Sequence, residues 1–306
     1  MNIGGEQGIQ AIIEDLQKQS EIIPDEHDGS YEAMRETIKS YSRMPSLSIV
    51  DIPDLNLVYL TSVGTWRHGV DSKKKLIRES SLPETEQDRL IAVWDKLWKK
   101  ACSNQYDDGI VNGKYSIGMF GTGFMSFEGK SNKECAEAFI QLCVDILPLS
   151  IDEEMYQKAE QVLTDSFAGM GPASASMVLH CLKPGTFPIM NSNMGNDDIF
   201  GVLGIDLDRP KHLETYISNT RKITAFRNEH FHFLNYRVFD KEAHRLREFE
   251  ITTDQALRQM QKSIDLKSDN RSETVNKTET EISKSTTKKM TDEEWAKELK
   301  KNTLVM

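Results

Sequence analysis

Apolar side chains recur along most of the chain with the three- and four-residue spacing of amphipathic helices. After Pro83, one such stripe collects Leu90, Val93, Trp94, Leu97 and Trp98. A capping box at residues 131–134 predicts a further helix, which Pro148 ends. The same spacing predicts helices at residues 7–19, 31–41 and 152–166. We therefore expect a mainly α fold.

Two stretches interrupt the helical pattern. Residues 55–63 form a mixed apolar segment, and residues 117–124 are rich in glycine and aromatic side chains, so we expect a minor β or loop element. Past residue 253 the chain turns polar, with almost no apolar side chain between residues 267 and 289, which is typical of disorder. The sequence thus predicts N-terminal helices over residues 1–50, a core over 51–253 and a flexible tail over 254–306. A short last helix carrying Trp295 is a candidate contact for a protein partner.

The formal net charge of −10 argues against nucleic-acid binding when the chain is taken as a whole. The acidic excess is concentrated at the start, because residues 1–57 hold 11 acidic and 4 basic side chains. Basic residues gather further along, where they predict a local basic face or, equally, solvated helix faces: Arg67, Lys73, Lys74, Lys75, Arg78, Lys96, Lys99, Lys100, Arg221, Lys222 and Arg227.

Several kinds of chemistry are not indicated. No run of about 18 apolar residues is present and the first ten residues lack a signal-peptide pattern, so we expect a soluble, cytoplasmic protein without membrane contacts. The four cysteines form no C-x-x-C pair, and His230 and His232 have no third ligand nearby, so we expect no metal or disulfide. Neither residues 109–114 nor residues 117–124 have the spacing of a nucleotide-binding loop, and no cofactor is expected.

The most informative segment spans residues 152–182. A predicted helix leads into Gly169-Met170-Gly171, and a second helix rich in small side chains follows, which is how a helix-hairpin-helix is built. The two glycines permit backbone geometry that a side chain would block, so that hairpin amides and the second helix N-terminus face a DNA phosphate. Such contacts need little net positive charge. The candidate DNA contacts are Gly169, Met170, Gly171, Ser174 and Asn193; a plain structural turn is the alternative.

The following residues sharpen this interpretation. Lys183-Pro184-Gly185 turns the chain into Phe187-Pro188-Ile189-Met190-Asn191-Ser192-Asn193-Met194. Together with the hairpin, this stretch resembles the helix-hairpin-helix DNA glycosylase superfamily, in which the catalytic aspartate follows the hairpin by about twenty residues. The resemblance is strong over residues 155–204. It implies a two-lobed helical fold that binds duplex DNA, flips a base out and cuts its glycosidic bond.

Two positions depart from the superfamily pattern. Ala173 stands where the bifunctional lyases have a lysine, so the resemblance implies a monofunctional enzyme. Asn191 stands at the position of the catalytic aspartate, and an amide lacks the charge that stabilises a cationic sugar. Asp197 and Asp198 are the nearest carboxylates and the candidates for that charge, although they also suit an N-cap for a helix at residues 199–203.

A second, broader resemblance covers about residues 51–246. Motifs at residues 58–67, at 119–123, in the hairpin and at 221–240 look like the region preceding the ATPase in McrB-type restriction proteins. This resemblance implies that the substrate is a modified cytosine in foreign phage DNA. The candidates for the pocket of a flipped base are Trp66, Phe124, Asn235, Tyr236 and Arg237, whose stacking and hydrogen-bonding groups would equally suit a structural network.

Three functions from different classes are consistent with these patterns. We favour a monofunctional glycosylase that excises a modified base from foreign DNA. The second is a non-catalytic reader of modified DNA, in which Asn191 marks lost chemistry. The third is a protein-interaction module in which the hairpin only packs helices.

Overall fold

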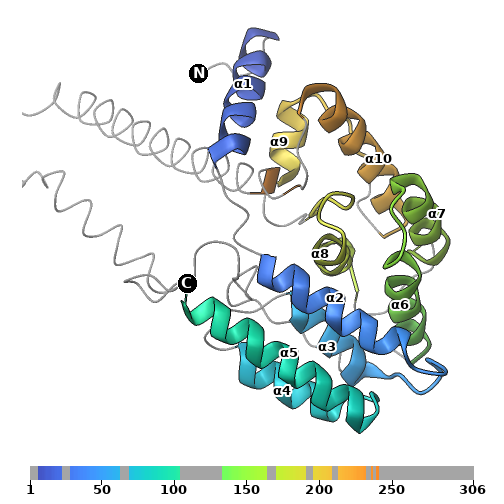
Figure 1. Cartoon of the computed structure of the whole chain (residues 1–306). Coiled ribbons are helices and arrows are strands. Elements are labelled where there is room, and N and C mark those ends of the chain that lie inside the picture. Colours follow the sequence, from blue (N-terminus) through green and yellow to red (C-terminus); the bar gives the residue numbers. More distant parts are fainter. Residues whose placement is uncertain are drawn as a thin grey trace, which may run out of the picture. The chain divides into compact units, whose positions relative to one another are not determined.

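The computed structural model describes residues 6–22, 28–62, 69–103, 133–163, 170–190, 196–208 and 213–231, together with residues 236, 239 and 240. All of them belong to the first of two compact units, residues 1–251; the second is residues 252–306. The described part of the chain is helical and contains no strand (Figure 1). Its helices are α1 (Glu6–Ile22), α2 (Asp28–Ser42), α3 (Ile52–Ser62), α4 (Gly69–Glu79), α5 (Glu84–Ser103), α6 (Lys133–Ile146), α7 (Asp152–Leu163), α8 (Pro172–Leu182), α9 (Asn196–Val202) and α10 (Leu213–His230).

The prediction of a mainly α fold is confirmed. The stripe expected after Pro83 lies on α5, where Leu90, Trp94 and Leu97 are fully buried. One expected departure from helix is wrong within the described residues, because the mixed apolar segment at residues 55–63 forms most of α3. Nearly every side chain of α3 is buried, so its apolar residues show no amphipathic period that would have marked it as a helix.

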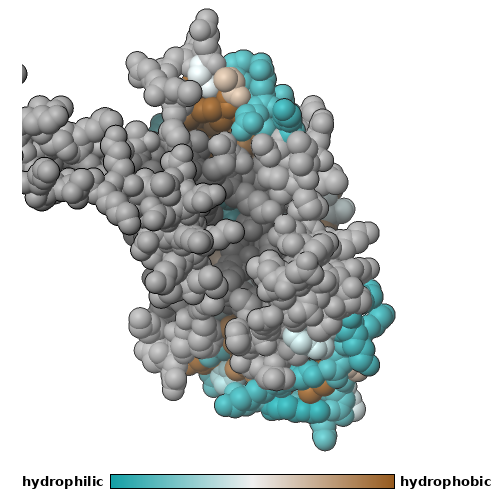
Figure 2. Space-filling view, turned by 90° about the vertical axis from the view of Figure 1, so that its left-hand side faces the viewer, coloured by the Kyte–Doolittle hydropathy of each residue, from teal (hydrophilic) through white to brown (hydrophobic). Residues whose placement is uncertain are grey.

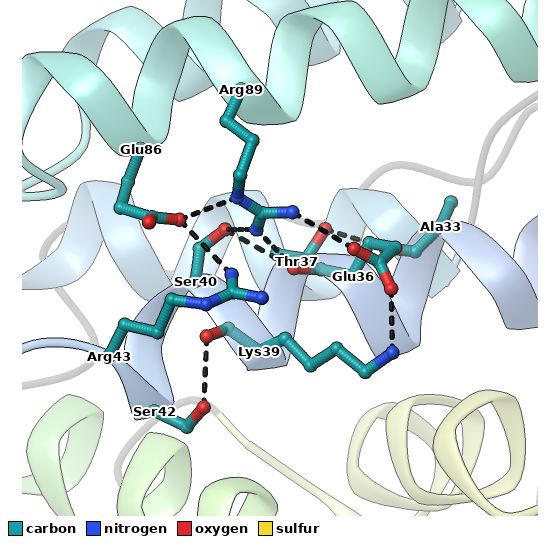
Figure 3. Close-up of polar contacts among 9 residues, drawn as sticks. All are labelled: Ala33, Glu36, Thr37, Lys39, Ser40, Ser42, Arg43, Glu86 and Arg89. Atoms are coloured by element: carbon teal, nitrogen blue, oxygen red, sulfur yellow. Dashed lines mark hydrogen bonds and ion pairs between the residues drawn. The ribbon is translucent and has the colours of Figure 1, made fainter.

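Helices α2, α3, α4 and α5 pack against one another, and polar contacts join α2 to α5 (Figure 3). The Arg89 guanidinium binds the carboxylates of Glu36 at 3.0 Å and Glu86 at 2.8 Å, and it donates to the Ser40 hydroxyl at 2.7 Å. Partial burial acts to raise the pKa of Glu36, but the hydrogen bonds from Lys39 and Arg89 outweigh it, so its pKa lies below the ordinary value. The network thus holds its carboxylates in the charged form.

A buried carboxylate fixes the start of α3. Asp54 is 1% exposed and accepts hydrogen bonds from the Tyr41 hydroxyl at 2.8 Å and from the backbone amides of Asp51 and Ser81, each at 2.9 Å. Because a buried charge is costly unless it is hydrogen-bonded, these three donors account for its place in the core. They tie α2, α3 and the connection between α4 and α5 together.

Helix α8 lies in the interior of this unit (Figure 1). It contacts α2 and α3 on one side and α10 on another, and α10 in turn contacts α7. Its composition suits this position, because small and apolar side chains line almost every face, and residues 174–176 and 178–182 are buried. The second helix of the predicted hairpin is therefore central to the fold.

The described surface is largely polar. On the face drawn in Figure 2, hydrophobic side chains show only in small groups among hydrophilic ones. Ile49 and Ile151 are the large apolar side chains that are exposed among the described residues. None of the described helices combines the length and apolar character needed to cross a bilayer.

Candidate nucleic-acid interface

Of the predicted hairpin, the structure describes the last two residues before α8, one buried and one exposed. Met170 is 6% exposed and packs in the core, whereas Gly171 is exposed and forms the N-cap of α8. Pro172 takes the first helical position, where a missing N–H costs nothing. Gly171 provides no side-chain cap, so the positive end of the α8 dipole meets the surface beside a residue without a side chain.

Glycine was expected at position 171 because its backbone angles would exclude a side chain, but the observed angles do not. Its φ of −107° and ψ of 178° are extended backbone that any residue adopts, and a Cβ built on it would meet nothing within 4 Å. The fold itself therefore does not require glycine at this position. Because Gly171 has no side chain, a ligand can approach the first turn of α8 from solvent.

Residues 183–190, which we call the strap, follow α8 and run back along it. Lys183 caps the C-terminal end of α8 through its backbone amide, which donates to the Leu179 carbonyl. Seven residues later, the Met190 amide donates to the Ser176 hydroxyl at 3.0 Å. Ser176 lies five residues past Gly171, which corresponds to about 7.5 Å along a helix axis. The strap thus carries the chain back to the second turn of α8, about midway along the helix.

The carbonyl groups of the strap are bonded by side chains from three helices. The Thr186 carbonyl accepts from the Tyr156 hydroxyl of α7 at 3.0 Å, and the Phe187 carbonyl accepts from the His180 Nδ1 of α8 at 2.8 Å. The Pro188 carbonyl accepts from the Tyr216 hydroxyl of α10 at 3.0 Å. Because residues 186–190 of the strap are buried and belong to no helix or sheet, these side chains replace the partners that secondary structure would give its backbone.

The start of the strap is fixed as well. The Arg227 guanidinium of α10 is 6% exposed and donates to the Gly185 carbonyl, and the Thr186 hydroxyl donates to Asp152 at the start of α7 at 2.8 Å. The Lys183 ammonium donates to the carbonyls of Leu147 and Leu149 at 2.8 and 2.7 Å, just after α6 ends. Burial, with a smaller contribution from Arg35, lowers the pKa of Lys183.

Tyr236, a predicted base-pocket residue, belongs to this internal network instead. It is 1% exposed, its hydroxyl lies 2.6 Å from the Thr224 hydroxyl, and the Arg227 guanidinium stacks 4.6 Å from its ring centre. Thr224 in turn lies 2.9 Å from the Tyr156 hydroxyl. Since the Tyr156 proton goes to the strap, the donors are ordered from Tyr236 through Thr224 to Tyr156. A structural role, not a base contact, accounts for Tyr236.

Ser174 also faces the interior. It is 3% exposed, and its hydroxyl is hydrogen-bonded to Tyr59 of α3, so its side chain is not on the surface that Gly171 occupies. Asp197 and Asp198 lie in the first turn of α9, inside the helix that they were expected to cap, and their side chains are outside the described set. The remaining candidates lie outside the described residues: Trp66, Phe124, Gly169, Asn191, Asn193, Asn235 and Arg237.

The predicted basic face is largely neutralised where the structure describes it. Lys74 pairs with Asp95, Arg78 with Asp88 and Lys222 with Asp208. Arg221 binds both Glu153 and Glu160 of α7, at 2.9 and 3.0 Å. These pairs leave backbone amides at the hairpin as the better candidates for phosphate contacts. The described residues contain no group of three or more His, Cys, Asp or Glu side chains that could hold a metal ion.

Sequence reasoning missed the residues that hold the strap. His180 and Tyr156 sit within helical patterns, where a polar tip on an apolar face gives no indication of its partner. Tyr216 lies in α10, a helix that the sequence did not predict. Compared with protein-family models, curated proteins and solved structures, the chain has no significant match.

Proposed function

We propose that the protein is a monofunctional DNA glycosylase of the helix-hairpin-helix type, which flips a modified cytosine out of foreign duplex DNA and excises it. The observation that supports this proposal is the path of the strap. It returns the chain from the C-terminal end of α8 to Ser176, near the hairpin, directly before Asn191. The proposal requires this proximity, because the hairpin would hold the DNA backbone while Asn191 faces the sugar next to it.

The reaction consists of water adding to C1′ of the sugar while the bond from C1′ to the base breaks. The base leaves with the bonding electron pair and takes up a proton in place of the one that the water loses. The developing positive charge on the sugar needs a negative partner, since electrostatic stabilisation is the main catalytic contribution in such a site. In this proposal Asn191 orients the sugar or the water, and Asp197 or Asp198 supplies the charge. An abasic site in phage DNA is the product.

A non-catalytic reader of modified DNA is the second candidate. The uncharged Asn191 favours it, because an amide neither accepts a proton near neutral pH nor balances a cation. A reader would use the same hairpin and strap for binding. The two candidates differ in whether a free base is released.

One assay separates these candidates. The purified protein is incubated with phage DNAs carrying different cytosine modifications, and the products are analysed for alkali-labile sites and for free base by mass spectrometry. The glycosylase proposal expects both products, and expects Asn191→Ala to abolish them while DNA binding is retained. Saturable binding without a released base supports the reader. Absence of DNA binding even at low salt would exclude both and favour a protein-interaction module.

A further inference from the structure

We infer that Ser176 is a positioning residue for the reaction, because its hydroxyl fixes the backbone immediately before Asn191 to the second turn of α8. This inference rests on the proposed function, in which Asn191 faces the sugar of the flipped nucleotide. Ser176 itself is buried, so it acts through the strap and does not contact DNA.

The Ser176 hydroxyl is held in one orientation. It donates its proton to the Ala173 carbonyl at 3.1 Å and accepts the Met190 amide at 3.0 Å. A hydroxyl has one proton to donate, so its direction is set by Ala173 and its lone pairs point to the strap. The side chain is fully buried and cannot exchange this partner for bulk water.

The bond between Ser176 and Met190 is the last along the chain of the contacts that hold the strap. The donors from α7, α8 and α10 hold the carbonyls of residues 185–188, whereas Ser176 holds residue 190. Of the anchors described, it is therefore the closest to Asn191 along the chain. Losing it leaves the earlier anchors intact and frees the end of the strap that carries the reacting position.

A small displacement at this point has a large effect on rate and a small one on binding. Misplacing a reacting group by about 1 Å costs on the order of 100-fold in rate. Gly171 itself takes no part in the Met190 bond. We therefore expect Ser176→Ala to slow base release by about 10- to 100-fold while the dissociation constant for DNA stays within about twofold.

The experiment compares three variants of the full chain with the wild type in single-turnover base release and in DNA binding. Ser80→Ala is the matched control, because the Ser80 hydroxyl likewise donates to a carbonyl three residues back, at 2.7 Å, and accepts a backbone amide, but lies between α4 and α5. Ser176→Thr retains the hydroxyl and is expected to regain most of the rate. Base release at the wild-type rate in Ser176→Ala, or an equal loss in Ser80→Ala, would overturn the inference.

Failure of the proposed function is distinguishable from failure of this inference. If the wild type releases no base from any DNA, the glycosylase proposal fails, and the role of Ser176 in the reaction fails with it. If the wild type releases base and Ser176→Ala does so at the same rate, only the inference about Ser176 fails. Hydrogen exchange of peptides covering residues 187–194 checks the anchor itself: faster exchange in Ser176→Ala, with Ser80→Ala unchanged, is expected, and unchanged exchange would overturn the inference.

Discussion

The Tyr216 hydroxyl donates a 3.0 Å hydrogen bond to the Pro188 carbonyl and so joins α10 to the middle of the strap. The Tyr216 ring also stacks on Phe187, with ring centres 6.4 Å apart and an angle of 20° between the planes. Burial raises the pKa of Tyr216 well above its ordinary value, so the hydroxyl keeps its proton and remains a donor. The contact combines a ring packed in the core with one polar bond to an irregular backbone.

We therefore expect Tyr216→Phe to destabilise the protein without changing its shape. The substitution keeps the stacked ring and removes only the hydroxyl, which leaves the Pro188 carbonyl buried without this donor. Loss of such a partner costs about 1–3 kcal/mol in the free energy of unfolding, measurable by urea denaturation. Tyr31→Phe, which loses a longer 3.4 Å contact with His180, is expected to cost less. Equal stability of Tyr216→Phe and wild type would contradict a structural role for the bond.

Much of the fold could be predicted because helical periodicity is a local property. The stripe on α5 shows at three- and four-residue spacing, and Pro83 and Pro148 bound their helices correctly. Helix α4 was missed, because its run of lysines interrupts the apolar pattern. Helix α10 was missed because polar side chains such as Asn219, Thr220 and Arg227 are buried in it, so its inward face does not look apolar.

The site was less predictable than the fold because its contacts are long-range. Tyr156 and Thr224 meet across 68 residues, and Tyr216 and Pro188 across 28. Tyr236 shows the consequence. Its residue type suits base stacking as well as a buried network, and only the position of Arg227 and Thr224 around it distinguishes the two.

The network between α2 and α5 predicts an acid-sensitive contribution to stability. Partial burial acts to raise the pKa of Glu86, as it does for Glu36, but hydrogen bonds and nearby positive charge outweigh it in both cases. Arg89 lowers the pKa of Glu86, and Lys39 together with Arg89 lowers that of Glu36. A carboxyl with a lowered folded-state pKa stabilises the protein fully above its unfolded pKa. That contribution is lost as the pH falls through the folded-state value, which lies below 4.5.

We expect Arg89→Met to remove most of this contribution, with the Lys39 pair of Glu36 left in place. The loss at pH 7 should be about 1 kcal/mol, because the groups are partly exposed and solvent screens them. The difference from wild type should shrink below about pH 4 as the carboxyls become protonated. Arg78→Met, which breaks the more exposed pair with Asp88, is the control and should show a smaller effect. If the stability difference between Arg89→Met and the wild type is the same at pH 7 and pH 3, the charges of Glu36 and Glu86 are not its cause.

The pairing of surface cations predicts a weak salt dependence of DNA binding. A protein that makes 6–10 phosphate contacts through Lys and Arg loses about 10³- to 10⁵-fold in affinity between 50 and 200 mM salt. Because Arg221 and Lys222 are occupied by Glu153, Glu160 and Asp208, we expect only about two such contacts and roughly a tenfold loss. Arg221→Ala should leave both the affinity and the slope unchanged in a binding titration. If affinity falls steeply with salt and Arg221→Ala makes the fall less steep, DNA binds the basic side chains around Arg221 instead.

Substitutions at Gly171 should change stability and DNA affinity in opposite directions. The residue is the N-cap of α8, has extended backbone angles and has open space where a side chain would stand. Serine and aspartate are better N-caps than glycine, so Gly171→Ser and Gly171→Asp should stabilise the protein by a few tenths of a kcal/mol. Their side-chain oxygens would, however, occupy the helix amides that the proposal assigns to a phosphate, and aspartate would add like-charge repulsion.

The expected order of affinity is therefore wild type, then Gly171→Ser, then Gly171→Asp, with about a tenfold loss for the last, since the loss of one charge-assisted contact is worth roughly 1.5 kcal/mol. Gly201→Ala, at another glycine with open space around it, is the control and should leave DNA binding unchanged. Thermal unfolding and binding titrations on the same preparations give both quantities. Because a misfolded variant would lose stability and affinity together, a gain in stability with a loss of affinity shows that the substitution acts at the DNA contact and not through the fold. The loss in the uncharged Gly171→Ser reports competition for the α8 amides, and the further loss in Gly171→Asp reports charge repulsion. Wild-type affinity in Gly171→Asp would place the DNA contact away from this helix end.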